Sequence, residues 1–316
     1  MASSIVVIGS YVQDLTFHLP EFPKPGQTLI GKFQSGPGGK GSNQAVAAAR
    51  TGTPTTFIGA TGQDAFAGVA RDFHKKEGID SQLAIKPDDA TGTAGILVNQ
   101  HGENEIVVAL GANASLTPSD ILEEIISKTR IVVTQLECNL EATNHALKLA
   151  RLNGVTTLLN PAPMRDDFPI EMLENVDILV PNETEFAHLL RTKFPDTYGS
   201  IEENAIQDIA PEALHELCRG FEVPTFIITL GSKGCFVSTA DSYFQTESIK
   251  GIDVVDTTGA GDAFVGGFAS GLINFDGDIK KASEYGNAVA GLSVTRRGTA
   301  PAMPYKDDIQ EVMKLD

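Results

Sequence analysis

The chain has 316 residues, of which 41% are apolar and 21% charged, and its formal net charge is -17 at pH 7. That length and apolar fraction support a large α/β domain with a substantial core and exclude an intrinsically disordered chain. The acidic balance disfavours nucleic acid and anionic membrane surfaces as partners, and no apolar run reaches the roughly 18 residues of a membrane-spanning helix.

The first third of the chain predicts strands on both sides of one helix. Residues 4–9 are β-branched and end in Gly, which is typical of a buried strand. Residues 15–36 alternate and carry several prolines, which predicts exposed strands with turns. The Ala-rich segment 41–50 predicts a helix packed closely on a sheet, followed by a strand at 55–59. Because residues 83–110 again predict strands, we expect one small sheet, formed by about 15–36 and 83–110, apart from the main sheet.

From residue 117 onward strands alternate with helices. Thr117, Pro118 and Asp120 together predict a helix start. The later predicted elements are strand 131–136, helix 140–152, strands 155–159 and 178–180, a helix from 183, strand 225–229, and helices 260–272 and 279–294. Residues 191–210 predict a surface insertion. Such alternation indicates a parallel sheet covered on both faces, so we predict a three-layer α/β sandwich with a central, mostly parallel sheet in a single domain spanning 1–316.

The segment Asp256-Thr-Thr-Gly-Ala-Gly-Asp-Ala-Phe264 carries the strongest chemical signal. It opens a predicted helix, so Gly259, Ala260 and Gly261 place unpaired N–H groups at the positive end of the helix dipole. That arrangement suits a phosphoryl group, and Asp262 beside it is placed to accept the proton of an attacking hydroxyl. The alternative is an ordinary helix cap with glycines for a tight turn.

Two other phosphate-binding patterns do not fit this sequence. A dinucleotide fingerprint needs a third glycine after Gly259 and Gly261, where Phe264 stands. A P-loop needs Ser or Thr after Gly39-Lys40, where Gly41 stands. A nicotinamide-dependent oxidoreductase is therefore disfavoured, and any phosphate transfer by this chain uses another architecture.

A second glycine-rich segment, Gly36-Pro-Gly-Gly-Lys-Gly-Ser-Asn43, opens the Ala-rich helix. Glycines let the backbone approach a ligand closely, and Asn43 at the helix start is suited to bind a sugar hydroxyl. Lys40 either belongs to this site or is a solvated loop charge.

These two segments resemble the two signature regions of the ribokinase (PfkB-type) family of carbohydrate kinases, and the resemblance spans nearly the whole chain. The further matches, in the family's order, are Gly9-Ser10, Gln135-Leu-Glu137, Asn160-Pro-Ala-Pro163, Pro181-Asn-Glu-Thr-Glu185 and Thr229-Leu-Gly-Ser-Lys-Gly234. The resemblance implies the ribokinase-like fold, with a small β lid that closes over the sugar and forms a homodimer contact. It implies a small-molecule sugar and ATP as partners, and Mg2+ and a monovalent cation, K+, as cofactors.

The resemblance also implies a role for each matching residue. Asp262 would be the general base, with Gly259, Ala260 and Gly261 forming an anion hole. The sugar would contact Val12, Asp14, Gly39, Lys40, Gly41, Asn43, Glu137 and Asp262. The nucleotide and Mg2+ would contact Asn182, Glu185, Thr229, Gly231, Ser232, Gly234, Gly261 and Asn287. The monovalent cation would contact Asp256, Thr258, Ser293, Arg296, Gly298 and Ala302, mostly through backbone oxygens.

Some of these roles have structural alternatives. Glu185 could be an exposed helix acid, and Asn287 could serve only the packing of its helix. Ala302 stands where ribokinases often carry Ser, so one side-chain contact to the cation would be missing.

Val12 departs from the ribokinase pattern, which has Asn at this place. A ribose hydroxyl against Val12 would lose a hydrogen bond, at a cost of about 1–3 kcal/mol. Deoxyribokinases, a close branch, carry an apolar residue there. The sequence therefore favours 2-deoxy-D-ribose as a substrate used as well as or better than D-ribose. The alternative is that Val12 only packs beneath the sugar.

Two other functions stay open. A nucleoside kinase of the same family would need a base pocket, which Tyr11, Phe17 and Phe33 could line. A sugar sensor without activity is disfavoured because Asp262 and the Asn182–Glu185 pair are all present.

The N-terminal residues and the cysteines indicate the compartment. The chain begins without the basic segment of a secretion signal, so we expect a cytoplasmic protein. Cys138, Cys218 and Cys235 follow no metal-ligand spacing and are expected to be reduced thiols. Cys138, next to Glu137, is a candidate reactive thiol.

Overall fold

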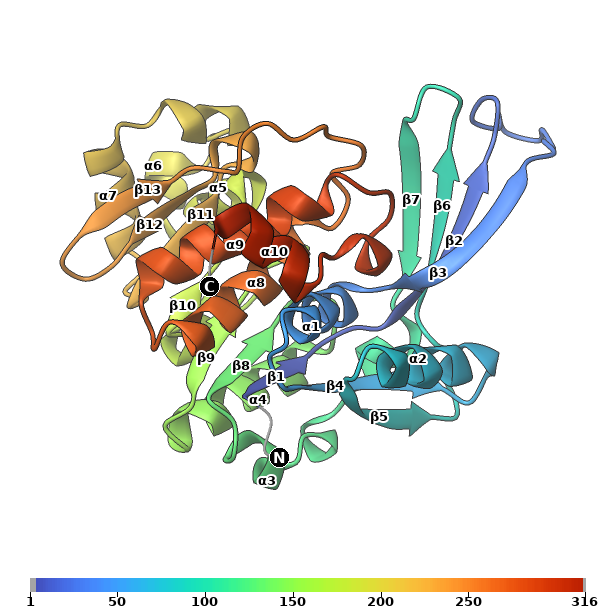
Figure 1. Ribbon diagram of the computed structural model, residues 1–316, viewed down its shortest axis with the longest axis horizontal. Helices are drawn as coiled ribbons and strands as arrows, with labels where there is room; N and C mark the ends of the chain where they lie inside the picture. Colours follow the sequence, from blue (N-terminus) through green and yellow to red (C-terminus); the bar gives the residue numbers. More distant parts are fainter. Residues whose placement is uncertain (1–3, 315–316) are drawn as a thin grey trace.

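Residues 4–314, which the computed structural model describes, form two β-sheets with helices packed on the larger one (Figure 1). The large sheet has nine strands in the order β13-β12-β11-β10-β9-β8-β1-β4-β5. These strands are β1 (Ile5–Ile8), β4 (Thr55–Gly62), β5 (Asp80–Lys86), β8 (Ile131–Thr134), β9 (Thr156–Leu159), β10 (Ile178–Leu179), β11 (Thr225–Thr229), β12 (Cys235–Ser238) and β13 (Tyr243–Thr246). All neighbours from β11 to β5 are parallel, and β12 and β13 add an antiparallel edge. The predicted mostly parallel sheet is confirmed.

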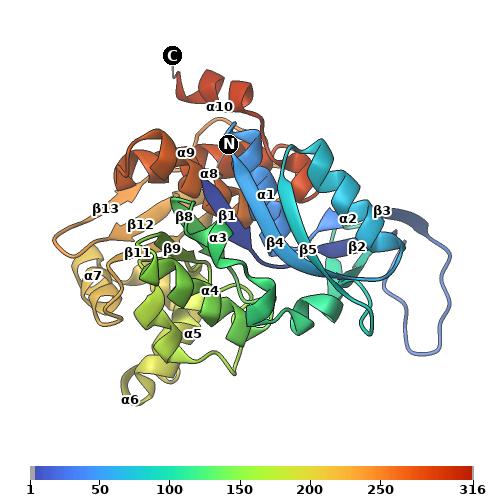
Figure 2. The ribbon, with the colours of Figure 1, turned by 90° about the horizontal axis from the view of Figure 1, so that it is seen from below.

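Helices cover both faces of this sheet (Figure 2). One face carries α1 (Lys40–Arg50), α2 (Ala65–Lys76), α8 (Ala260–Asn274), α9 (Ile279–Ser293) and α10 (Lys306–Met313). The other face carries α3 (Glu123–Ile126), α4 (Leu140–Leu152), α5 (Glu183–Lys193), α6 (Pro195–Tyr198) and α7 (Pro211–Arg219). No helix within residues 4–314 is long and apolar enough to cross a membrane.

Strand β1 shows why the sheet is buried on both faces. Ile5 and Val7 pack into the cluster under α1, α8 and α9, whereas Val6 and Ile8 pack into the cluster under α4. All of them are at most 2% exposed. A strand buried on both faces is apolar without alternation, which is the pattern that the sequence has at 4–9.

Helix α8 lies unusually close to α1. A Cβ atom at Gly266 would lie 2.4 Å from the carbonyl oxygen of Gln44 and 2.6 Å from the Cβ atom of Ala47. Only a glycine permits that approach, because real Cβ contacts are longer. The start of α8, with Asp262, is thereby set against the first turns of α1.

The small sheet stands to one side of the main layers (Figure 1). Its order is β3-β2-β6-β7, with strands β2 (Val12–His18), β3 (Lys32–Gly38), β6 (Thr93–Val98) and β7 (Asn104–Ala109). Strands β2 and β6 are parallel, and the two outer pairs are antiparallel. Three residues separate β1 from β2, and β3 ends just before α1, so the small sheet is joined directly to the two elements that begin the main domain.

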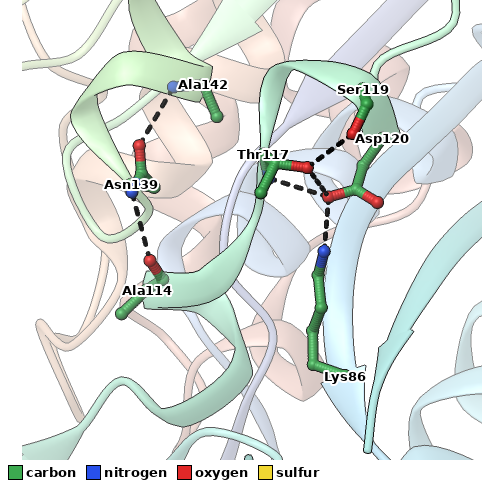
Figure 3. Close-up of polar contacts among 7 residues, drawn as sticks. All are labelled: Lys86, Ala114, Thr117, Ser119, Asp120, Asn139 and Ala142. Atoms are coloured by element: carbon green, nitrogen blue, oxygen red, sulfur yellow. Dashed lines mark hydrogen bonds and ion pairs between the residues drawn. The ribbon is translucent and has the colours of Figure 1, made fainter.

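The predicted bounds of the small sheet were partly wrong. Residues 83–86 belong to β5, which pairs with β4 in the large sheet. The half-exposed pattern of this edge strand resembles that of the small sheet, and the sequence pattern does not reveal which sheet a strand joins. Lys86 at the end of β5 also binds Asp120 at 2.6 Å and thereby fastens β5 to the main domain (Figure 3). The first predicted segment of the small sheet, 15–36, also starts too late, because β2 begins at Val12.

Other elements differ in extent from the predictions. At the predicted helix start Thr117 and Asp120 form a capping box (Figure 3). It opens only a short 3-10 turn, Pro118–Asp120, before the four-residue α3. The segment 191–210 contains the end of α5, α6 and a 3-10 turn, and its Ile206 is buried. Helices α2, α7 and α10 and strands β12 and β13 had not been predicted.

Candidate active site

Polar side chains from several elements meet at the carboxyl edge of the large sheet, where ligands bind in open α/β folds. A hollow of about 160 Å³ lies there. Asn160, Val180 and Thr229 line it from the ends of β9, β10 and β11, and the other walls are the starts of α1, α5 and α8. The hollow thus unites segments that are far apart in the sequence.

The start of α8 offers free N–H donors. Gly259 caps the helix in the left-handed region at φ +79°, which favours glycine. The N–H of Ala260 donates to the carbonyl of Thr257 at 3.2 Å. The N–H groups of Gly261 and Asp262 have no hydrogen-bond acceptor within residues 4–314. The N–H of Gly259 is likewise without an acceptor in the described part of the chain, so of the three predicted donors only that of Ala260 is engaged. A helix N-terminus with free donors attracts anions.

Asp262 is 6% exposed and lies in the first turn of α8. Its Oδ2 accepts from Nδ2 of Asn43, and its Oδ1 accepts from Nε2 of Gln44, both at 3.0 Å. Both oxygens are therefore held by neutral amides of α1. Asp262 does not act as an ordinary helix cap, because its carboxylate accepts no hydrogen bond from its own helix and is bound by α1 instead.

Lys40 lines the hollow rather than lying free in a loop. Burial lowers the pKa of its ammonium, but Asp262, Glu137 and Glu185 raise it, and the net shift is upward. Lys40 therefore remains a cation between three carboxylates.

Asp14 and Glu137 are not among the residues that line the hollow, but Glu137 binds the backbone of Lys40, which does line it. Glu137 accepts from Oγ of Ser10 at 2.5 Å and from the N–H of Lys40 at 3.0 Å. Burial, and then the charge of Glu137, raises the pKa of Asp14 to about 7. Buried Oδ1 of Asn43 has no donor within residues 4–314, so it is an acceptor suited to a ligand hydroxyl.

The remaining predicted sugar contacts lie nearby. Gly39 and Gly41 flank Lys40 at the start of α1, and the N–H of Gly41 lies 3.4 Å from Oγ of Ser10. Val12 is 3% exposed and faces Gly38 across the β2–β3 pair.

Asn182 and Glu185 bind each other at the start of α5. The N–H of Asn182 donates to Oε2 of Glu185 at 2.9 Å, and the N–H of Glu185 donates to Oδ1 of Asn182 at 2.8 Å. Glu185 is 7% exposed, so it is not an exposed helix acid. Burial raises its pKa to about 7, although the Asn182 N–H and Lys40 lower it. One carboxylate with a neutral amide fits Mg2+, which keeps several waters and needs few protein ligands.

The predicted nucleotide residues divide into two groups. Thr229 lines the hollow, and Gly231, Ser232 and Gly234 form the tight turn that follows it. Asn287 lies apart from the hollow's lining. Its amide donates to Oγ1 of Thr246 at 2.8 Å and to the carbonyl of Glu247 at 3.2 Å, so these contacts support the structural alternative for Asn287.

The predicted cation residues lie on the loop before α8, at the end of α9 and on the segment that follows α9. The carboxylate of Asp256 accepts from the N–H groups of Thr258 at 2.9 Å and Gly298 at 3.0 Å. Burial raises the pKa of Asp256, but these bonds hold it below its usual value. The Arg296 side chain pairs with Asp308, and the Ser293 hydroxyl donates to its own helix. Ala302 follows in a 3-10 turn, Ala300–Ala302. Carboxylate and carbonyl oxygens are the types of ligand that a hard monovalent cation takes, and the Asp256 hydrogen bonds bring three of the predicted residues, Asp256, Thr258 and Gly298, together.

Cys138 is not the reactive thiol that its position suggested. It is 2% exposed, and burial raises the pKa of its thiol far above its usual value. A buried thiol without thiolate character is inert.

The sequence assigned no role to the polar residues behind Asp262, which are Gln44, Gln135 and Asn160, although Gln135 and Asn160 stand in segments that match the family. Gln44 directly follows Asn43, while Gln135 and Asn160 follow the apolar strands β8 and β9. A polar residue just beyond each buried strand was the available signal.

Comparisons with known proteins show which proteins this chain resembles over its length. A model described as pfkB family carbohydrate kinase matches residues 2–306. The ribokinase of Staphylococcus aureus (strain COL) is 36% identical over 317 residues, covering 99% of this chain and 100% of that protein. The deoxyribokinase of Salmonella typhi is 35% identical over 317 residues and 99% of each chain. The structure of Arabidopsis thaliana ribokinase complexed with ribose and ATP is 28% identical, with a TM-score of 0.85 and 100% of both chains covered.

We predict that the stability of the ligand-free protein falls as pH rises, partly because of Asp14. The folded chain holds this proton up to a pH of about 7, whereas the ordinary value is 3.8. Between these values the native state binds more protons than the unfolded chain, so the free energy of unfolding decreases with pH. Asp14→Asn removes this titration and should raise that free energy at pH 8 by about 1–3 kcal/mol, since some solvent contact reduces the full effect.

Urea unfolding at several pH values between about 4 and 8 measures the effect. The gain from Asp14→Asn should shrink toward the acidic end. Asp88→Asn, on the exposed β5–β6 loop, should leave the pH slope of the wild type unchanged. Identical slopes for wild type and Asp14→Asn would contradict the prediction.

Proposed function

The chain belongs to the pfkB family of carbohydrate kinases and is an ATP-dependent sugar kinase, and we propose that it transfers the γ-phosphate of ATP to O5 of 2-deoxy-D-ribose or D-ribose. One observation carries the proposal. A buried carboxylate, Asp262, and two free backbone N–H groups lie at the same helix start and face a hollow that Lys40 and Glu185 also line.

In the proposed reaction Asp262 accepts the proton of the O5 hydroxyl. The O5–phosphorus bond forms as the bond between the γ-phosphorus and the oxygen of the leaving ADP breaks, so no covalent enzyme intermediate arises. The free N–H groups of Gly261 and Asp262 would donate to the phosphoryl oxygens, where charge develops. Lys40 adds a positive charge beside them.

Cations would complete the site. Mg2+ would neutralise the charge of the ATP phosphates, with Glu185 and Asn182 holding it through water. We propose that K+ binds the loops of Asp256, Thr258, Ser293, Arg296, Gly298 and Ala302 through their oxygens. It would fix the segment that leads into the start of α8.

The sugar would lie between the start of α1 and the small sheet. Asp14 and Glu137 are suited to accept pairs of hydroxyl protons, since a carboxylate accepts at both oxygens. The unpaired Oδ1 of Asn43 supports a further hydroxyl contact. Closure of the small sheet would exclude water and limit ATP hydrolysis.

The side chains proposed for a nucleoside pocket argue against that alternative. Tyr11 is fully buried, and its hydroxyl donates to Gln13 at 2.7 Å. Phe17 lies three positions from Asp14 in β2, and its ring packs on that of Phe33 at 5.2 Å between centroids. Alternate residues of a strand face opposite sides, so these rings lie on the face away from Asp14.

We expect Asp262→Asn to abolish most turnover while leaving the fold intact. Loss of a general base reduces kcat by about 10²–10⁴-fold, because the amide cannot take the proton. A coupled assay of ATP turnover should compare D-ribose, 2-deoxy-D-ribose, fructose and nucleosides, each with and without K+. Calorimetry should find sugar binding retained by the variant.

A kcat for Asp262→Asn within about tenfold of the wild type would contradict the assigned base. If the wild-type protein binds a sugar but turns over no ATP, the result would instead support the alternative of a sugar sensor without activity.

We predict that 2-deoxy-D-ribose is used at least as well as D-ribose. Val12 presents no hydrogen-bonding group to an additional hydroxyl. Val12→Asn should improve kcat/KM for D-ribose relative to 2-deoxy-D-ribose by about tenfold, the value of one recovered hydrogen bond. Val12→Ala, which adds no polar group, should affect the two sugars alike. A wild-type preference for D-ribose above about tenfold would overturn the assignment.

We also propose that two copies of the chain associate through the small sheet. Phe17, Phe33 and Val107 are 39%, 59% and 75% exposed. The strand register places them on one face, opposite to Asp14, and such exposed apolar patches mark interfaces. Sedimentation should find a dimer that Val107→Glu dissociates, whereas Val69→Glu on α2 should not. A monomeric wild-type protein would contradict the proposal.

A further inference from the structure

A buried network of side-chain amides stands behind Asp262, and Gln44 is its centre. Gln44 is fully buried in α1. Its Nε2 donates to Oδ1 of Asp262 and to Oδ1 of Asn160, both at 3.0 Å. Its Oε1 accepts from Nε2 of Gln135 at 2.6 Å. Every polar atom of this side chain is therefore engaged, and the carboxamide has no freedom to rotate.

The backbone sets the direction of the network. Nδ2 of Asn160 donates to the carbonyl of Val180 at 2.8 Å, and a carbonyl only accepts. The other end of the Asn160 amide, Oδ1, must then accept from Gln44. That bond fixes Nε2 of Gln44 on the side of Asn160 and Asp262, so the second N–H of this nitrogen donates to Asp262. The amide oxygen of Gln44 then accepts from Gln135. The carboxylate of Asp262 therefore meets a donor and never the amide oxygen.

We propose that Gln44 is a positioning residue, which holds the carboxylate of Asp262 in one rotation for proton transfer. Asn43 binds one oxygen of the carboxylate and Gln44 the other, so rotation about the Cβ–Cγ bond would break at least one of these bonds. The inference rests on the proposed function, in which Asp262 is the base.

The chemistry of the donors fits this role. A carboxylate that binds Arg or Lys is stabilised in its charged form and becomes a weaker base. The side-chain donors to Asp262 within residues 4–314 are both uncharged amides. They orient the carboxylate without supplying a positive charge to it.

Gln135, at the far end of the network from Asp262, has a feature that does not favour stability. Oε1 of Gln135 is buried without a donor within residues 4–314, and buried polar atoms in proteins are nearly always satisfied. A Cβ atom at Gly9 would lie only 2.0 Å from that oxygen. Glycine at position 9 therefore makes room for Gln135, which in turn orients Gln44.

Gln44→Met tests the proposal, because methionine fills a similar volume without hydrogen bonds. We expect kcat to fall by about 10²-fold, as misplacement of a reacting group does. Dissociation constants of sugar and ADP from calorimetry should stay within about threefold of the wild type. In the Asp262→Asn background, Gln44→Met should cause no further loss of kcat, since Gln44 acts through the carboxylate. Gln135→Met should lower kcat less than Gln44→Met.

Asp120→Ala is the control for general destabilisation. It removes the Lys86 ion pair and the Thr117 bonds (Figure 3), and it should lower the melting temperature without changing kcat. The proposal is overturned if Gln44→Met keeps kcat within about threefold of the wild type, or if it lowers kcat equally when residue 262 is Asn.

Crystal structures separate this inference from the proposed function. If the wild-type protein phosphorylates no sugar, the proposed function fails. A carboxylate of Asp262 that turns away from its wild-type rotation in Gln44→Met still supports the positioning role, and an unmoved carboxylate overturns it.

Discussion

Asp262 is a buried carboxylate whose hydrogen bonds come from a different helix, and the architecture around it follows from that requirement. A buried charge is tolerated only when it is hydrogen-bonded, and the donors here are Asn43 and Gln44 of α1. Those amides reach α8 only because Gly266 lets the two helices approach to a distance at which any Cβ atom would collide. This close helix contact therefore lies one turn from the proposed centre of the chemistry.

The same first turns of α1 connect the core to the small sheet. Strand β3 runs into α1 through Gly39, and β2 leaves β1 through Gly9, Ser10 and Tyr11. Glu137 accepts from both Ser10 and the Lys40 backbone. It thereby links the β1–β2 connection to the β3–α1 connection beside the hollow. A sugar bound at this junction would contact the small sheet, the start of α1 and α8 at once. Closure of the sheet and placement of the base would thus depend on the same few residues.

The sequence could predict elements whose pattern is local and residues whose chemistry is unusual. The buried run of β1, the Ala-rich α1 and the glycines before Asp262 are such signals. It could not predict which sheet β5 joins, because an edge strand has the same half-exposed pattern in either sheet. It also gave no role to Gln44, Gln135 and Asn160, although the last two stand in segments that match the family. An isolated amide after a strand has no chemistry of its own, and only the fold shows that these amides form one directed network ending at Asp262.

The charges at the hollow explain how so acidic a chain could bind an anionic nucleotide. Three carboxylates, Glu137, Glu185 and Asp262, act on the ammonium of Lys40, and the charge of Glu137 also acts on Asp14. Burial raises the pKa values of Asp14 and Glu185 to about 7, so near neutral pH part of this formal negative charge is held as neutral acid. The N-terminus of α8 adds partial positive charge without a side chain. The local field at the hollow is consequently less negative than the formal net charge of the chain implies, and a phosphate at the start of α8 would meet the free N–H groups of Gly261 and Asp262, in a hollow that Lys40 also lines.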